Sequence, residues 1–202
     1  MNKITKDALI LFAITLIAGV LLGLAHEVTL EPIAKAQEAS TQATYAEVYP
    51  EAASFEEDEE LDSHIEEASA EVLAKYQLNT AINYVKVAKD ASGNVCGYLV
   101  SAQAKGYGGP VNIAVGISTD MKITGIGFLS IDETPGLGMK AKEESFYGQF
   151  PGMPADHELT LTKTTKTSED QVQAISGATK TSNAVTAATN AAIYFVTTYV
   201  NK

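Results

Sequence analysis

The hydrophobic and polar positions divide the chain into three regions. Residues 8–25 form an uncharged run of eighteen residues rich in Leu, Ile, Ala and Val, which is close to the ~20 residues that a helix needs to cross a bilayer. Residues 26–80 are polar and Ala-rich, with an unbroken acidic run at 56–60, and they predict a helical stalk followed by a solvated linker. Over residues 81–202, short apolar runs alternate with turn residues, which indicates a separate folded domain.

The third region predicts an antiparallel meander followed by helices. Strand-like runs separated by turn residues occur at 82–88, 95–102, 111–117 and 123–129. Three further elements are expected: a helix near 142–149, a strand near 159–163 and a long helix over 183–200. The last of these carries apolar residues at helical spacing, which predicts a buried core face: Val185, Ala188, Ala192, Phe195, Val196 and Tyr199. We therefore expect an α+β fold, with an antiparallel sheet and flanking helices behind a single apolar N-terminal helix.

The apolar run at 8–25 is interpreted as an uncleaved membrane anchor. Lys3 and Lys6 precede it and acidic residues follow it, so the preference for positive charge on the cytoplasmic side places residues 1–7 in the cytoplasm and the later residues outside. A cleaved export signal is the alternative, because small residues at 23–25 would permit cleavage. The run is longer than the roughly 7–15 apolar residues of a signal peptide, which favours the anchor. Both interpretations export the domain.

Composition restricts the possible partners and cofactors. The 202 residues carry a net charge of -11 and no Arg, and the part that follows the anchor holds twelve lysines against twenty-four acidic residues. This excess of negative charge argues against nucleic acid or anionic lipid as a partner. The single cysteine, Cys96, lies in a strand-like run and is expected to be a buried core thiol. One cysteine excludes an intrachain disulfide and a Cys-ligated iron-sulfur or zinc site, and the three histidines show no metal-binding spacing.

Residues 173–183 form a turn rich in small hydroxyl residues that leads into the last predicted helix. They read Gln-Ala-Ile-Ser-Gly-Ala-Thr-Lys-Thr-Ser-Asn. Gly177 permits a sharp turn and a close approach of the backbone to a ligand, and Thr181 or Ser182 is expected to cap the helix. A turn that only caps a helix is the simplest reading of this segment taken alone.

The start of this helix can also hold an anion. Unpaired amide groups and the positive end of the helix dipole favour a phosphate there. Ser176 and Thr179 add hydroxyl groups, and Lys180 adds a positive charge. A phosphate-containing ligand is therefore the second reading.

A second segment, Asp-Glu-Thr-Pro-Gly-Leu-Gly at 132–138, follows the last strand-like run. Taken alone it predicts a rigid turn, because Pro135 restricts one backbone angle and Gly136 permits a positive one. The two segments in this order resemble the covalent-FMN domain of the G subunit of Rnf complexes and of the C subunit of the sodium-pumping NADH:quinone reductase. The Gly-rich loop at 105–110 and the aromatic residues at 146–150 follow the order of that family, and the resemblance covers roughly residues 80–190.

The resemblance implies that FMN is attached through a phosphoester to the threonine of Ser-Gly-Ala-Thr, which is Thr179 here. Ser176, Gly177 and Ala178 would form the attachment turn, and Lys180 or Lys163 would supply a cation near the phosphate. No His or Asp adjoins Thr179 in the sequence, so a separate flavin transferase is the expected attaching enzyme.

The other loop would hold the isoalloxazine ring. By resemblance, Gly136 and Gly138 let the backbone approach the ring, Leu137 packs on its face, and Glu133 or Thr134 forms a hydrogen bond to its polar edge.

The function implied is that of an electron-carrying flavoprotein subunit of a membrane-bound, ion-translocating complex of the Rnf type, linked to ferredoxin and NAD. Electrons would pass between carriers of partner subunits on the outer side of the membrane. NAD itself is not expected to bind, because no Gly-x-Gly-x-x-Gly turn lies between a strand and a helix. A stand-alone membrane-tethered flavin reductase and a non-redox binding module are the alternatives.

Overall fold

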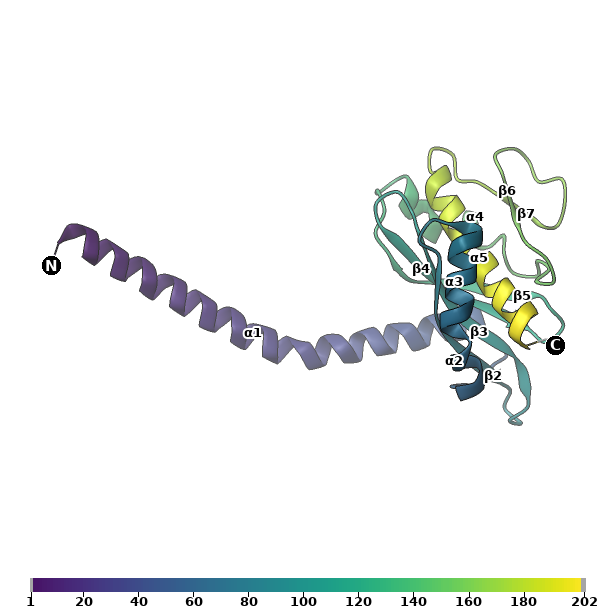
Figure 1. Cartoon of the computed structure of the whole chain (residues 1–202), viewed down its shortest axis with the longest axis horizontal. Coiled ribbons are helices and arrows are strands. Elements are labelled where there is room, and N and C mark those ends of the chain that lie inside the picture. The colour runs from purple at the N-terminus through teal and green to yellow at the C-terminus, as the bar shows by residue number, and fades with distance from the viewer. Residues whose placement is uncertain (1, 201–202) are drawn as a thin grey trace. The chain divides into compact units, whose positions relative to one another are not determined.

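The computed structural model describes residues 2–200, which form two compact units that divide between residues 42 and 43 (Figure 1). Helix α1 (Lys3–Val48) makes up the first unit and contributes its last residues to the second. Every other helix and strand of the described residues lies in the second unit.

The first unit is an apolar helical segment. Of the described helices, α1 alone is long and apolar enough to cross a membrane, by length and composition. Its large apolar side chains, such as Leu9, Phe12 and Leu22, are exposed. A helix that is apolar on every side is suited to contact with lipid or with a large apolar core. The apolar helix expected at 8–25 and the stalk helix expected after it are one continuous element.

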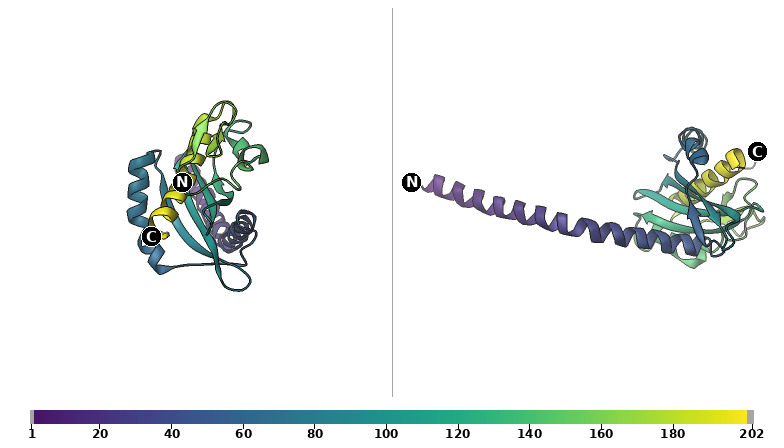
Figure 2. Two further views of the ribbon diagram at one scale, coloured as in Figure 1. Left: turned by 90° about the vertical axis from the view of Figure 1, so that its right-hand side faces the viewer. Right: turned by 90° about the horizontal axis from the view of Figure 1, so that it is seen from below.

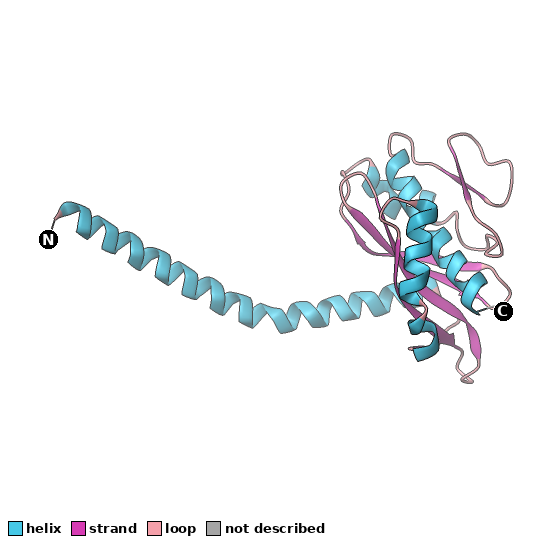
Figure 3. Cartoon of the chain, in the orientation of Figure 1, coloured by secondary structure: helices cyan, strands magenta, loops and turns pink. Residues whose placement is uncertain are grey.

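The second unit is built on a five-stranded antiparallel sheet (Figure 3). The strands follow the order of the chain: β1 (Ser54–Glu56), β2 (Ala81–Lys89), β3 (Val95–Lys105), β4 (Pro110–Ser118) and β5 (Ile123–Ile131). The predicted meander is therefore confirmed. The edge strand β1 was not predicted, and it pairs Phe55 with Ala88 of β2.

Two helices cover one face of this sheet (Figure 2). Helix α5 (Thr179–Phe195) lies across β3 and β4, and α3 (Ile65–Tyr76) packs against β2. A π-helical turn, Val196–Val200, continues α5. The apolar face predicted for this helix lies in the core, although Tyr199 is only half-buried.

Helix α5 is buried on more sides than its apolar pattern predicted. Thr186, Thr189 and Asn190 are also buried, because the chain around residue 159 covers the side that faces away from the sheet. There Asn190 Oδ1 accepts a hydrogen bond from the amide of Leu159 at 2.8 Å, and its Nδ2 donates to the carbonyl of the same residue at 2.9 Å. The polar residues of α5 are thus part of the core through their hydrogen bonds.

The remaining elements are short. They are α2 (Glu59–Ser63), the 3₁₀ helix η1 (Gly138–Lys142), α4 (Glu144–Tyr147), and the parallel pair β6 (Thr160–Thr162) and β7 (Gln171–Gln173). The helix expected near 142–149 is therefore a 3₁₀ turn followed by one α-helical turn. The strand expected near 159–163 is β6.

The opposite face of the sheet receives the last turns of α1. Tyr45 and Val48 are 3% and 1% exposed and pack against Leu99 and Ala114. These two strand residues alternate with the neighbours that face α5, as side chains on a strand must. The folded unit therefore extends further toward the N-terminus than the boundary at residue 81 that the patterns indicated.

Glycines in the sheet make room for α1. A Cβ atom at Gly125 would lie 2.9 Å from the carbonyl oxygen of Val48, and one at Gly116 would lie 3.0 Å from a Val48 methyl group. A Cβ atom at Gly127 would overlap with the side chain of Thr44. The absence of side chains at these positions lets the helix backbone lie directly on the strands.

Hydrogen bonds fasten the same helix end to the sheet. Tyr45 donates to the hydroxyl of Tyr84 at 2.6 Å, and Tyr49 donates to the carbonyl of Cys96 at 2.6 Å. Burial raises the pKa of Tyr49 well above its ordinary value, so this hydroxyl remains a donor. Cys96 itself is half-buried, not fully buried as expected, and its Sγ donates to the carbonyl of Ala88.

The acidic run is more ordered than a mobile linker. Asp58 accepts hydrogen bonds from the amides of Glu60 and Leu61 at 3.0 and 3.2 Å and so caps α2. Glu57 pairs with Lys86 at 2.9 Å, and Glu56 pairs with Lys89 at 2.5 Å. Local capping and ion pairs therefore hold these exposed acids beside β2.

Replacing Gly125 by Ala is expected to destabilise the second unit. The added Cβ would press on the backbone of Val48, and overpacking of this kind costs ~1–3 kcal/mol. Urea unfolding followed by tyrosine fluorescence measures the change, since the chain has nine Tyr and no Trp. Gly109→Ala is the control, because its Cβ would meet no atom closer than 3.5 Å. An equal loss in both variants would show that contact with α1 is not the cause.

Candidate functional site

A tight turn follows β5. The amide of Leu137 donates to the carbonyl of Thr134 at 3.1 Å, and Gly136 has a φ angle of +75°. Pro135 precedes this glycine, so the turn has the residue pattern of a type II β-turn, in which the third position requires a positive φ. The turn ends in η1 and leaves the side chain of Leu137 46% exposed.

A second turn of the same kind precedes α5. The amide of Ala178 donates to the carbonyl of Ile175 at 3.0 Å, and Gly177 has a φ angle of +79°. A Cβ atom at Gly177 would lie 3.3 Å from a methyl group of Leu137. The two turns, about forty residues apart in the sequence, therefore touch.

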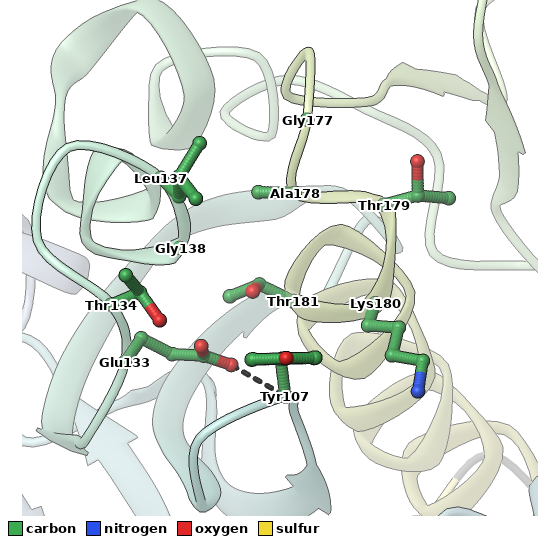
Figure 4. A pocket seen from close by; sticks show the side chains of 10 residues that line it. All are labelled: Tyr107, Glu133, Thr134, Leu137, Gly138, Gly177, Ala178, Thr179, Lys180 and Thr181. Atoms are coloured by element: carbon green, nitrogen blue, oxygen red, sulfur yellow. Dashed lines mark hydrogen bonds between the residues drawn. The ribbon is translucent and has the colours of Figure 1, made fainter.

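A cavity of about 590 Å³ lies between these turns (Figure 4). Its size falls in the ~300–1,000 Å³ range of small-molecule sites. Ten residues line it: Tyr107, Glu133, Thr134, Leu137, Gly138, Gly177, Ala178, Thr179, Lys180 and Thr181. They come from the loop between β3 and β4, the turn after β5, and the start of α5.

Glu133 is the buried charged residue of the cavity. It is 7% exposed, and its Oε1 and Oε2 accept hydrogen bonds from the amides of Tyr107 at 2.7 Å and Gly108 at 3.2 Å. A buried carboxylate is costly unless it is hydrogen-bonded, and these two amides meet that need. The structure therefore shows Glu133 bound to the neighbouring loop.

The first turn of α5 has no side-chain cap. The helix begins at Thr179, its N-cap residue is Ala178, and no side chain hydrogen-bonds to the cap amides. The expectation that Thr181 or Ser182 caps the helix is wrong, because the helix starts four residues earlier than predicted. Ser182 lies inside the first turn, where its buried hydroxyl accepts from the amide of Ile175 and donates to the carbonyl of Ala178, both at 3.0 Å.

Thr179 differs from the other hydroxyl residues of α5. The hydroxyls of Ser182, Thr186 and Thr189 each donate to the carbonyl four residues earlier. Within residues 2–200, by contrast, the half-buried side chain of Thr179 makes no hydrogen bond. Because Thr179 also lines the cavity, its oxygen is available for bonding at the start of the helix.

Lys180 and Tyr107 form a pair at the rim. The ammonium group of Lys180 lies 5.5 Å from the ring centroid of Tyr107, which is a cation–π distance. Both side chains are exposed. The pair places a positive charge near the start of α5.

The structure brings together eight of the eleven residues proposed for the site from the sequence. Gly136 shapes the first turn without lining the cavity, Ser176 borders a separate hollow of about 250 Å³, and Lys163 is exposed after β6. Tyr107 and Thr181 line the cavity and were not proposed as ligands. The Gly-rich loop around Tyr107 was the available signal for the first of these.

Comparison with known proteins assigns this part of the chain to a family. Residues 106–194 match the FMN-binding domain, and this segment contains every residue that lines the cavity. The chain is 37% identical to the G subunit of the Na(+)-translocating ferredoxin:NAD(+) oxidoreductase complex of Acetobacterium woodii, over 93% of this chain and 89% of the relative.

A second relative agrees with this assignment, and a solved structure shares the fold. The G subunit of the ion-translocating oxidoreductase complex of Methanosarcina acetivorans is 33% identical over 96% of this chain and 95% of that protein. Among solved structures, NqrC of Shewanella oneidensis shares the fold, with a TM-score of 0.52 and 19% identity over 76% of this chain and 72% of that chain.

Gly138→Ala is expected to lower the free energy of unfolding by ~1–3 kcal/mol through overpacking. The new Cβ would lie 2.6 Å from Oε2 of Glu133 and 2.7 Å from Oγ1 of Thr181. Urea unfolding measures the loss, and Leu137→Ala is the matched control, because it shortens a half-exposed side chain of the same cavity. Parental stability of Gly138→Ala would contradict the close approach of Glu133 to this glycine.

Proposed function

The chain belongs to the family of G subunits of ion-translocating oxidoreductase (Rnf) complexes and carries an FMN-binding domain, and on this premise we propose that Thr179 bears a covalent FMN through which the subunit passes electrons. The reaction is the one named for its relatives, electron transfer between ferredoxin and NAD coupled to ion transport. When bound, FMN supplies the reversible electron-carrying chemistry. The chain supplies the attachment point, the enclosure and the charges around it.

The single observation that carries this proposal is the position of Thr179. This residue lines a cavity of about 590 Å³ and is the first residue of an uncapped helix. A phosphodiester at this oxygen carries about one negative charge. The free amides of the first turn, the helix dipole and Lys180 suit such a charge.

The rest of the cavity suits a flat, mainly apolar ring with polar edges. Leu137 and Tyr107 present apolar surface, and Thr134 and Thr181 present hydroxyl groups. No histidine or aspartate lines the cavity among the described residues, and both oxygens of Glu133 accept amide hydrogen bonds. The chain therefore lacks an evident base for its own modification, which supports attachment by a separate flavin transferase.

The first test of the attachment is Thr179→Ala. The denatured parent chain should show flavin fluorescence in a gel, and its Thr179 peptide should be heavier by FMN less one water. Thr179→Ala should abolish both signals, since no oxygen remains to form the ester, at a stability cost of at most ~1–2 kcal/mol.

Two matched variants complete this test. Thr179→Ser retains a hydroxyl and should retain at least part of the signal, whereas Thr165→Ala removes an exposed hydroxyl outside the cavity and should leave the signal unchanged. Undiminished fluorescence in Thr179→Ala would exclude this residue as the attachment point.

We also propose that residues after the apolar segment face the outside of the cell. Lys3 and Lys6 lie before the apolar run, and acidic residues follow it, as the positive-inside tendency requires for this orientation. The electron route would then run on the outer side of the membrane, between this FMN and carriers of the partner subunits.

Cysteine labelling of intact cells tests this orientation. In a Cys96→Ser background, Glu59→Cys should react with a membrane-impermeant thiol reagent. Glu59 is exposed, whereas the neighbouring Asp58 caps α2 and should be left intact. Asn2→Cys is the control and should react only after the membrane is opened. The reverse pattern would place the FMN domain in the cytoplasm.

A further inference from the structure

The buried carboxylate of Glu133 has no cationic partner in the part of the chain that the structure describes. Among residues 2–200, no Lys or His lies within ion-pair distance of it. Acidic side chains are seldom buried without such a partner. The amides of Tyr107 and Gly108 are its hydrogen-bond donors, at 2.7 and 3.2 Å. The group therefore serves to hold the loop between β3 and β4.

Two glycines fit closely around this carboxylate. A Cβ atom at Gly106 would overlap with Oε1 of Glu133, and one at Gly138 would lie 2.6 Å from Oε2. Both loops thus approach the carboxylate with backbone alone. This close packing restricts the Glu133 side chain to one position. Its hydrogen bonds in turn fix the positions of the Tyr107 and Gly108 amides.

The loop held by Glu133 carries an aromatic ring at the cavity. Tyr107 is 69% exposed and Leu137 is 46% exposed, and both line the cavity from different loops. In the view of Figure 4, Leu137 lies above Tyr107, and Thr134 and Thr181 lie at heights between them. Large exposed side chains gathered at one opening indicate a ligand that covers them.

We propose that Glu133 is a positioning residue, which holds the loop at 106–109 so that the ring of Tyr107 lies against one face of the flavin while Leu137 contacts the other. This inference rests on the function proposed above. A flat aromatic ligand gains both apolar contact and ring–ring interaction from such an arrangement. Glu133 acts through the backbone of Tyr107 and does not itself reach the reacting atoms.

The spectroscopic test uses the full-length chain purified in detergent after flavin attachment. A tyrosine stacked on a flavin quenches its fluorescence by donating an electron to the excited ring, and the electron then returns. Tyr107→Leu should therefore raise the fluorescence of the native protein severalfold, with the same amount of flavin in a denaturing gel. Tyr107→Phe keeps an aromatic ring against the flavin but lacks the hydroxyl. The absorption spectrum of the flavin in this variant reports the ring contact separately from the quenching of fluorescence.

Glu133→Gln should also raise the native fluorescence. The amide group keeps the size of the carboxylate, but its NH₂ faces a backbone donor, so one of the two hydrogen bonds to the loop is lost. If Glu133 acts through Tyr107, Glu133→Gln should add nothing in the Tyr107→Leu background. Glu143→Gln is the matched control, because this exposed acid makes no side-chain hydrogen bond among the described residues.

Amide hydrogen exchange supplies a readout that does not need flavin. In the Thr179→Ala chain, Glu133→Gln should accelerate exchange at Tyr107 and Gly108, with little change in β3 and β4. Unchanged exchange at the Tyr107 and Gly108 amides in Glu133→Gln overturns the proposal. Faster exchange at these amides also overturns it if the native fluorescence of the flavin-loaded Glu133→Gln chain is unchanged. A general loss of protection with a lower unfolding midpoint and no spectroscopic change would assign Glu133 a purely structural role. If the parent chain carries no flavin, the proposed function fails, and the exchange result still decides whether Glu133 holds the loop.

Discussion

The packing of α5 across β3 and β4 is the constraint on which the cavity depends. The side of the helix that faces the sheet is rich in alanine, including Ala184, Ala188 and Ala191, all fully buried. Small side chains let the helix lie close to the strands, as dense cores require. This fixes the start of α5 beside the loop between β3 and β4 and beside the end of β5. Three segments distant in the sequence therefore meet at one edge of the sheet.

At this edge of the sheet, two fixed turns lie beside a helix start without a side-chain cap. Two turns with positive φ at Gly136 and Gly177 set the backbone path. The buried hydrogen bonds of Glu133 tie the Tyr107 loop to the turn after β5. In contrast, the first turn of α5 lacks a side-chain cap and the Thr179 side chain lacks a hydrogen-bond partner among the described residues. The amides of a helix start that have no such cap are open to water or to a ligand.

The opposite face of the sheet has a different role. Glycines at 116, 125 and 127 leave space for the last turns of α1, and Tyr45 and Tyr49 fasten that helix end through their hydroxyl groups. The same helix that carries the long apolar segment therefore ends as part of the core of the second unit. The end of α1 thus packs on one face of the sheet, and α5, whose first residues line the cavity, packs on the other.

Local patterns in the sequence determined the elements and much of the site. The apolar run, the four strands of the meander and the two glycine turns each depend on neighbouring residues, so periodicity and turn chemistry were sufficient to predict them. The tertiary structure alone decided where α5 begins, that its polar residues are buried, and that residues 43–80 pack with the domain. It also decided that Glu133 binds the Tyr107 loop, because that hydrogen bond joins residues twenty-six positions apart. Such contacts arise from the packing of helices on a sheet, which no single stretch of sequence specifies.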